Sequence, residues 1–205
     1  MNNPGYIFQY RSLAEALHQA LAEDAFYIAM EASVPGSPAH RREAMLRYYD
    51  FSIREGHRYG EVVASDTPAV GASIWTRPVD AEADQRRTEA KHAFLRLHMG
   101  IASLETYDRI TGSMARQTGS VLRPGSWYLS IIGVSPAFQG RGLGGGLVRP
   151  MLERTDQMGV STYLETFTAR NMPFYSRLGY EPVAVFDEPG AKARYWVMVR
   201  RPPAP

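Results

Sequence analysis

Apolar and polar positions alternate most clearly in the second half of the chain. Residues Trp127–Val134 are mostly β-branched or aromatic and are apolar on both faces, which predicts a strand in the interior of a sheet. After this strand the spacing of apolar residues switches between helix and strand periods. It predicts a helix over about 142–158, a strand over 161–167, a short helix over 171–178 ended by Gly179, and a closing hairpin of 182–187 and 194–200.

The first half of the chain predicts helices separated by a few strands. Ser12-Leu-Ala-Glu15 has the pattern of a capping box, in which a serine and a glutamate satisfy the first backbone donors of a helix. Leucines at helical spacing follow it. The other expected elements are a strand over 6–10, a helix over about 39–54, strands over 61–65 and 69–75 joined by an Asp-Thr-Pro turn, and helices within 80–116 that Gly100 and Gly112 interrupt.

Apolar and aromatic residues in this last helical region have two interpretations. Phe94, His98, Met99 and Tyr107 could line a pocket, or they could be the core-facing stripe of amphipathic helices. We expect the mouth of any acceptor pocket near residues 24–27 and 94–107.

The composition indicates one soluble domain and excludes several classes of protein. The 205 residues are 44% hydrophobic and include no cysteine, which excludes a disulfide scaffold, a thiolate metal site and a cysteine nucleophile. The 23 basic residues are scattered and nearly balanced by 21 acidic ones, so we expect no nucleic-acid partner. No stretch approaches the about 20 apolar residues of a membrane span. We therefore expect a cytoplasmic protein with no membrane partner, and the spacing of its five histidines predicts no metal site.

A glycine-rich segment, Gln139-Gly-Arg-Gly-Leu-Gly-Gly-Gly146, lies between a predicted strand and a predicted helix. Glycines let backbone amides approach a ligand closely, and a helix N-terminus adds unpaired N–H groups with a partial positive charge. Each glycine in a helical turn costs about 1 kcal/mol relative to alanine, so several of them indicate a compensating function. The segment predicts a phosphate or pyrophosphate site, and the alternative is a loop that needs glycine only for close packing.

The identity of the anion can be narrowed from the residues around the glycines. A nucleoside-triphosphate loop would end in Gly-Lys-Ser/Thr, whereas this one continues Gly-Leu-Val. Gly140, Gly142 and Gly145 match the dinucleotide fingerprint, with Glu165 about 20 residues further on. That fingerprint should follow its strand directly, but Ser135–Gln139 intervenes. An NAD(P)-binding oxidoreductase is therefore a weaker alternative.

Two motifs in fixed order give the chain a family resemblance. Gln139–Gly144 has the form Q-x-x-G-x-G before an apolar helix, and Asn171-Met-Pro-Phe-Tyr-Ser-Arg-Leu-Gly-Tyr180 opens a short helix downstream. With these motifs the sequence resembles the GCN5-related N-acetyltransferase (GNAT) family, strongly in its C-terminal half and only in element order before that. Within the family, Gly133–Pro136, Leu164–Thr166 and Arg170–Gly179 are similar to the corresponding runs of puromycin-acetylating members.

The resemblance implies a fold and an activity. The expected fold is a single α/β domain, residues 1–205, with a mixed and mostly antiparallel sheet of about seven strands, flanked by helices and containing a splayed central strand pair. Residues of about 1–125 would form the acceptor side and about 126–205 the acetyl-CoA-binding core. The implied activity is direct acetylation of a primary amine of a small molecule, for instance an aminonucleoside antibiotic, in a ternary complex by a monomer or homodimer. A non-catalytic coenzyme-A-binding module is the other alternative.

The resemblance also assigns residues to acetyl-CoA, the expected co-substrate. Gly133 interrupts a β-branched strand, which indicates a bulge or a close backbone approach, or only relief of crowding in the core. By resemblance Ile132 and Val134 would offer main-chain hydrogen bonds to the pantetheine arm. The residues assigned to the phosphates are Gln139, Gly140, Arg141, Gly142, Leu143, Gly144 and Gly145.

Three side chains are candidates for the chemistry. Tyr175 is the expected proton donor to the departing thiolate, since a tyrosine with a pKa of about 10 stays protonated at neutral pH; its alternative role is a core aromatic. Asn171, one helical turn earlier, would bind the pantetheine arm or cap the helix. Glu165 is the candidate general base, and its alternative is a half-buried residue paired with an arginine such as Arg170.

Overall fold

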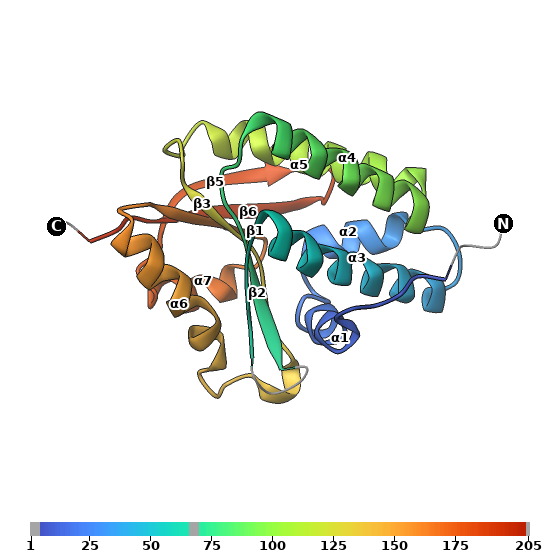
Figure 1. Ribbon diagram of the computed structural model, residues 1–205, viewed down its shortest axis with the longest axis horizontal. Coiled ribbons are helices and arrows are strands. Elements are labelled where there is room, and N and C mark those ends of the chain that lie inside the picture. The colour runs from blue at the N-terminus through green and yellow to red at the C-terminus, as the bar shows by residue number, and fades with distance from the viewer. Residues whose placement is uncertain (1–4, 66–69, 204–205) are drawn as a thin grey trace.

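A central six-stranded sheet organises the molecule, which is a computed structural model describing residues 5–65 and 70–203 (Figure 1). The strands are β1 (Gly60–Ala64), β2 (Gly71–Thr76), β3 (Trp127–Val134), β4 (Thr162–Thr166), β5 (Glu181–Glu188) and β6 (Ala193–Arg200). Their order in the sheet is β1-β2-β3-β4-β6-β5, and every neighbouring pair is antiparallel except β3 and β4. The expected α/β class and mixed sheet are confirmed, with six strands in the described residues instead of about seven.

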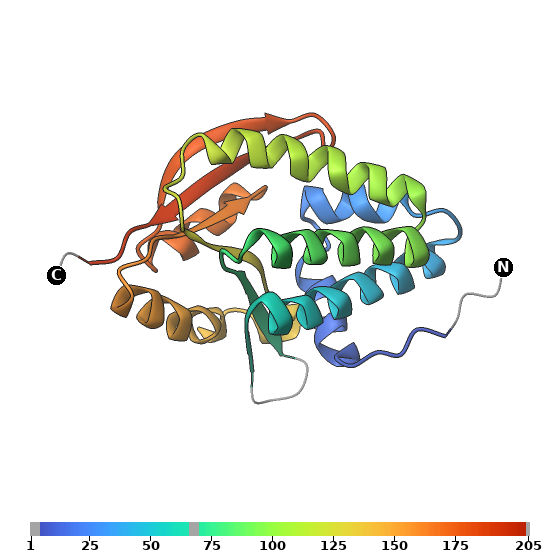
Figure 2. The same ribbon diagram turned by 45° about the horizontal axis from the view of Figure 1, so that its top comes forward.

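Helices cover both faces of this sheet. They are α1 (Arg11–Ala20), α2 (Ala25–Ser33), α3 (Pro38–Tyr59), α4 (Ala81–His98), α5 (Ile101–Gly119), α6 (Leu143–Gln157) and α7 (Met172–Ser176), with short 3₁₀ turns η1 (Pro136–Phe138) and η2 (Ala169–Asn171). The α1 and α3 helices pack on one face, and α6 packs on the other. In Figure 2, α3, α4 and α5 lie side by side on the first face, where they form a helical layer with α2.

The layers are held by separate apolar clusters. One cluster joins α1, α3 and α4 to the sheet and includes Leu17, Ile53 and Ile131. A second lies between the sheet and the α6–α7 side and includes Leu129 and Val148. Among the residues with two interpretations, Phe94 and Met99 are buried in the first cluster, whereas Tyr107 lines a cavity. Part of that helical region is therefore core, and another part lines a cavity, so each interpretation is correct for some of its residues.

The central strands β3 and β4 diverge after a short paired start. They are parallel, and their register includes only Trp127 opposite Thr162 and Tyr128 opposite Tyr163. On its other side β3 stays paired with β2 as far as Val134. Within the described residues, the edge of β3 from Leu129 onward therefore faces a gap and not a neighbouring strand, as expected for a splayed pair.

A β-bulge in β3 lies where this gap opens. Ile131 pairs with Ile74 and Leu129 pairs with Trp75, so Ser130 is the extra residue. Because side chains alternate along a strand, the extra residue reverses which positions face which side. Leu129 and Ile132 both face α6, while Ile131 faces the α1–α3 side. The bulge thus lies at Ser130 and not at Gly133.

Several expectations for the first half were wrong. Residues 6–10 form no strand, and the capping box does not form, because α1 begins at Arg11 without a side-chain cap and Glu15 pairs with Arg11 at 3.2 Å. The α2 helix was not expected, and α3 and α5 are longer than predicted, with Gly112 inside α5. The expected Asp-Thr-Pro turn lies outside the described residues, and β2 begins at Gly71.

Asp50 explains why the N-terminal segment is ordered without a strand. Its buried carboxylate accepts hydrogen bonds from the Tyr6 hydroxyl at 2.8 Å and from the backbone N–H groups of Gln9 and Tyr10 at 2.9 and 2.6 Å. These donors satisfy the carboxylate, which would otherwise be costly to bury. The segment is fixed against α3 by a distant residue and not by a neighbouring strand.

Candidate active site

The glycine loop forms the start of α6 as the sequence indicates. The Gln139 side chain donates from Nε2 to the Val134 carbonyl oxygen at 2.9 Å and closes the loop onto the end of β3. Gly140 and Gly142 have φ angles of +77° and +76°, which only glycine adopts readily, and Gly142 is the N-cap. The Gly145 N–H donates to the carbonyl oxygen of the N-cap Gly142 at 3.2 Å. The N–H groups before it have no acceptor within the helix, so the exposed loop presents donors and the positive end of the helix dipole.

Some of the remaining loop residues are exposed, and others pack against neighbouring elements. Arg141 and Leu143 are exposed, and the Arg141 guanidinium lies 5.5 Å from the Phe138 ring centre. A Cβ at Gly144 would lie 3.2 Å from the Phe174 ring, so this glycine allows α7 to approach α6. Gly145 is buried beside Arg149. Anion binding and close packing thus both account for glycines in this segment.

Gly133 allows a close approach of α1 and does not form a bulge. It pairs regularly with Ala72, and a Cβ at this position would lie 2.9 Å from both the Ala20 Cβ and the Leu17 Cδ2 atoms. The interpretation as relief of crowding is therefore correct. On the opposite face of β3, Val134 lies beside Gly144, which brings the end of the strand and the glycine loop together.

A cavity of about 730 Å³ lies between the sheet and the layer of helices. Residues of α2, α3, α4 and α5 form its outer walls, and β2, β3 and β4 form its floor. Six tyrosines line it: Tyr27, Tyr48, Tyr59, Tyr107, Tyr128 and Tyr163. The expected mouth near 24–27 is confirmed by Asp24, Phe26 and Tyr27, whereas Phe94 does not line the cavity.

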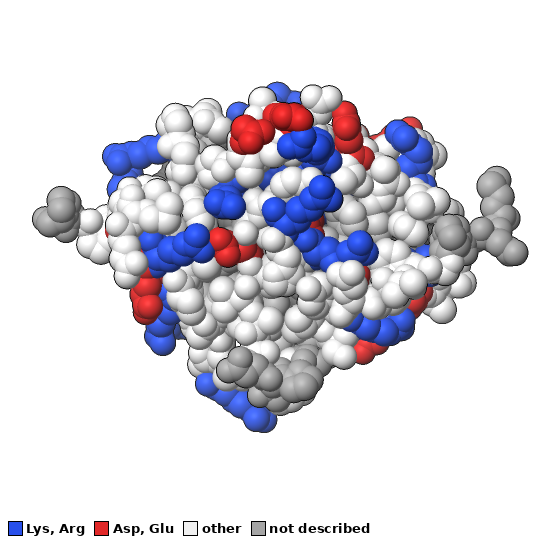
Figure 3. All heavy atoms as spheres, viewed as in Figure 1, with Lys and Arg blue, Asp and Glu red and all other residues white. Residues whose placement is uncertain are grey.

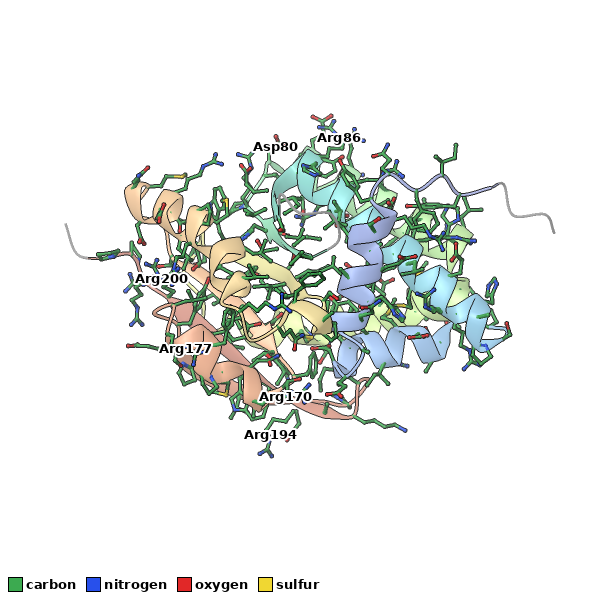
Figure 4. The ribbon with its side chains drawn as sticks, turned by 90° about the horizontal axis from the view of Figure 1, so that it is seen from below. Asp80, Arg86, Arg170, Arg177, Arg194 and Arg200 are labelled. Atoms are coloured by element: carbon green, nitrogen blue, oxygen red, sulfur yellow. The ribbon has the colours of Figure 1, made fainter. Side chains whose placement is uncertain are left out.

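Glu165 projects from β4 into this cavity and is held by two hydroxyl groups. Thr118 donates to its Oε1 atom, and the Tyr128 hydroxyl donates to Oε2 at 2.9 Å. Burial raises the pKa of the Glu165 carboxyl, and these two hydrogen bonds oppose that effect. The alternative pairing with Arg170 is wrong, because Arg170 pairs with Glu23 at the surface on the α7 side (Figure 4).

Most other charges in the cavity are compensated. Lys91 is buried, pairs with Glu55 at 3.0 Å, and lies over the ring of Tyr48. His92 Nε2 lies 2.9 Å from an Asp108 carboxylate oxygen. Among the described cavity residues, Glu165 and Asp24 are the carboxylates without an ion-pair partner. The compensated pairs carry no local sequence signal, because the two partners of each pair lie on different helices.

Tyr175 lies buried in α7, within the apolar cluster between the sheet and the α6–α7 side. Burial raises its pKa, and the charge of Asp24 raises it further, so the hydroxyl stays protonated at neutral pH. Its ring lies 5.1 Å from that of Phe174 in an edge-to-face arrangement. Asn171 is exposed at the start of α7 and makes no side-chain cap, so the capping alternative is wrong. The two residues are one helical turn apart.

The described residues contain neither a candidate metal site nor a candidate membrane span. No group of three or more His, Asp or Glu residues there could hold a metal ion. No helix in the described part is both long and apolar enough to cross a membrane. On the face shown in Figure 3, basic and acidic side chains lie interspersed over the surface.

Comparisons with known proteins agree with this architecture. An N-acetyltransferase of Schizosaccharomyces pombe, itself uncharacterized, is 34% identical over 79 residues, which are 38% of this chain and about a third (32%) of that relative. The crystal structure of the histone acetyltransferase HPA2 and related acetyltransferase from Corynebacterium glutamicum superposes with a TM-score of 0.60 at 20% identity, over 98% of this chain and 96% of that one.

Two structures of insect proteins share the fold at lower sequence identity. A mosquito arylalkylamine N-acetyltransferase-like protein has a TM-score of 0.52 at 18% identity, over 94% of this chain and 95% of its own. The polyamine N-acetyltransferase of Drosophila melanogaster, which forms N-acetylagmatine, has a TM-score of 0.53 at 16% identity, over 93% and 96%.

A match to a protein-family model assigns the chain to a family. The mostly antiparallel sheet is not the parallel sheet of a dinucleotide-binding fold, which removes the NAD(P) interpretation of the glycines. The model of the acetyltransferase (GNAT) family matches residues 72–180, more than half of the chain, including β3, the glycine loop and α7. The chain therefore belongs to the acetyltransferase (GNAT) family.

Proposed function

We propose that the protein transfers the acetyl group of acetyl-CoA directly to a primary amine of a small molecule, with both substrates bound together. The observation that carries this proposal is the gap between β3 and β4. The glycine loop lies at one end of β3, and the aromatic cavity lies on the α1–α5 side of the same strand. Two ligands approaching from these two sides would meet in the gap.

The residues around the gap fit acetyl-CoA, which would supply a reactive thioester and a thiol leaving group. The N–H groups of Gly140–Gly145 at the start of α6 would hold its phosphates. The unpaired edge of β3 near Ile132 and Val134 would hold the pantetheine arm as an added strand. Asn171, exposed at the start of α7, would bind the same arm.

Tyr175 would donate the proton that the departing sulfur requires. Its hydroxyl is protonated at neutral pH, and α7 packs against the glycine loop through Phe174 and Gly144. Glu165 lies at the start of the gap, beside Tyr128, and is the sequence-predicted general base. A backbone N–H near Val134 would stabilise negative charge on the carbonyl oxygen under attack.

The cavity supports a small amine as acceptor. Its volume lies within the range of about 300–1,000 Å³ that is usual for small-molecule sites. Aromatic walls and two uncompensated carboxylates favour a positively charged molecule. Structural neighbours named for arylalkylamines, polyamines and agmatine are consistent with this class, and the aminonucleoside antibiotics suggested by the sequence motifs are a further candidate.

The test is the release of free thiol when the protein is mixed with acetyl-CoA and single amines. Because the chain has no cysteine, a thiol-reactive dye reports coenzyme A without background from the protein. The panel is phenethylamine, agmatine, spermidine and puromycin, with mass spectrometry of the product. We expect amine-dependent release for at least one of them. Acetyl-CoA binding by calorimetry without release would favour the non-catalytic module, and absence of both would refute the proposal.

A further inference from the structure

Asp24 occupies a position in the cavity that the sequence motifs do not assign. It is the N-cap of α2, where its Oδ1 atom accepts a hydrogen bond from the Phe26 N–H at 3.0 Å. The same residue lines the wall of the cavity. One carboxylate oxygen is therefore committed to the helix, and the group as a whole remains accessible from the acceptor side.

The groups around Asp24 are tyrosines and not cations. Its negative charge raises the pKa values of the hydroxyls of Tyr27, Tyr49 and Tyr175, which belong to α2, α3 and α7. The charged groups that line the same cavity are Glu55 with Lys91, Asp108 with His92, Arg87, which pairs with Asp84, and Glu165. Asp24 thus lies within electrostatic range of the proposed proton donor, and no cation of the described residues pairs with it.

Glu165 is less suited to accept a proton than its position suggests. Each of its two carboxylate oxygens already accepts a hydrogen bond, from Thr118 and from Tyr128. These hydrogen bonds oppose the rise in pKa that burial causes, and they engage both oxygens of the carboxylate. Its contacts are those of a group that shapes the pocket by fixing Tyr128, which stacks on Tyr163 with ring centres 4.6 Å apart.

We propose that Asp24 contacts the amine of the acceptor and takes the proton that the amine must lose during acetyl transfer. This inference rests on the proposed function. In the step, the amine nitrogen forms the bond to the acetyl carbon as its N–H bond breaks, and the proton goes to Asp24. The bond between the acetyl carbon and sulfur breaks, and the sulfur takes the proton of the Tyr175 hydroxyl. Proton transfer from Asp24 to Tyr175, through the adjacent hydroxyls or water, restores both groups.

The electrostatic environment agrees with this role. Burial raises the pKa of the Asp24 carboxyl to about 6, against the hydrogen bonds from the start of α2 that lower it. A base works best when its pKa lies near the working pH. Because Asp24 must be ionised to accept a proton, the activity should fall as the pH drops through about 6.

The experiment is the variant Asp24→Asn, assayed with an amine that the wild type acetylates. Asparagine is as good an N-cap as aspartate, so α2 should still form. We expect kcat/KM at pH 7 to fall on the order of 100-fold, as is usual for loss of a positioned base, with acetyl-CoA affinity unchanged. The additional decrease that the wild type shows below about pH 6 should disappear, which leaves only the steady rise to pH 9 that the formation of free amine in solution produces.

Two variants serve as controls. Glu23→Gln changes the neighbouring exposed carboxylate, which pairs with Arg170, and should keep wild-type kinetics. Glu165→Gln should keep the decrease near pH 6 whatever its effect on KM. The inference is overturned if Asp24→Asn retains that decrease, or keeps more than half of the wild-type kcat/KM at pH 7. A wild type that acetylates no amine would instead refute the proposed function.

Discussion

Replacing Tyr175 with phenylalanine separates a chemical role from a packing role. The change removes one oxygen from a buried side chain, and within the described residues that hydroxyl makes no hydrogen bond to protein. The ring keeps its contacts with Phe174 and Tyr180. We therefore expect the free energy of unfolding to change by less than about 1 kcal/mol. Turnover should fall on the order of 10²- to 10⁴-fold, which corresponds to about 2.7–5.4 kcal/mol in the activation barrier.

Tyr180→Phe is the matched control. This neighbouring tyrosine is equally buried, but its hydroxyl accepts a hydrogen bond from Thr162 at 2.9 Å. Removing it leaves the buried Thr162 hydroxyl without an acceptor, so we expect a loss of about 1–3 kcal/mol in unfolding free energy and unchanged turnover. Urea denaturation and thiol release measure the two quantities. The role of Tyr175 as proton donor is refuted if Tyr175→Phe keeps turnover within threefold of wild type.

Three further predictions concern other parts of the molecule. Asp50→Ala leaves three donors without their acceptor and should lower the unfolding free energy in urea by about 2–4 kcal/mol, whereas a loss below 1 kcal/mol would contradict the anchoring role. Gly142→Ala places a side chain at φ +76° and should weaken acetyl-CoA binding in calorimetry; Gly146→Ala, where an added Cβ meets nothing, should bind normally. Asp24→Asn should change stability with pH. The pKa of its carboxyl is raised from 3.8 to about 6, so folding disfavours the charged form. The unfolding free energy of the variant should therefore match that of the wild type below pH 3.8 and exceed it by up to about 3 kcal/mol at pH 8. Equal urea midpoints at pH 8 would contradict the raised pKa.

The sequence was informative where structure depends on neighbouring residues. Trp127–Val134 forms the predicted strand with the same bounds, and the closing hairpin lies within two residues of its predicted position. These segments have strong local periodicity and glycine breaks. The glycine loop and Tyr175 were found in the same way, because a motif concentrates them in short stretches.

Segments whose contacts are distant could not be predicted in this way. The apolar run over 6–10 has strand-like composition but packs on α3 through Asp50, about 40 positions away. The α2 helix, AFYIAMEAS, is apolar on most sides and lies between α3 and α5, so it lacks the polar face that marks an amphipathic helix. The Lys91–Glu55 pair meets only through packing of this kind, so the sequence indicated residues 24–27 of the cavity but not its charged lining.

The extra residue in β3 sets which side chains of this strand reach the cavity and which reach the side of α6. Tyr128, Ser130 and Ile131 line the cavity, while Ile132 and Val134 face the side of α6. Substitutions at position 128 can therefore change the cavity while the α6 side of the strand keeps its shape. Deleting Ser130 would remove that freedom, since a one-residue slip would turn every side chain after it to the opposite face. Changes in what the cavity admits should therefore arise by substitution at these lining positions, with the length of β3 unchanged.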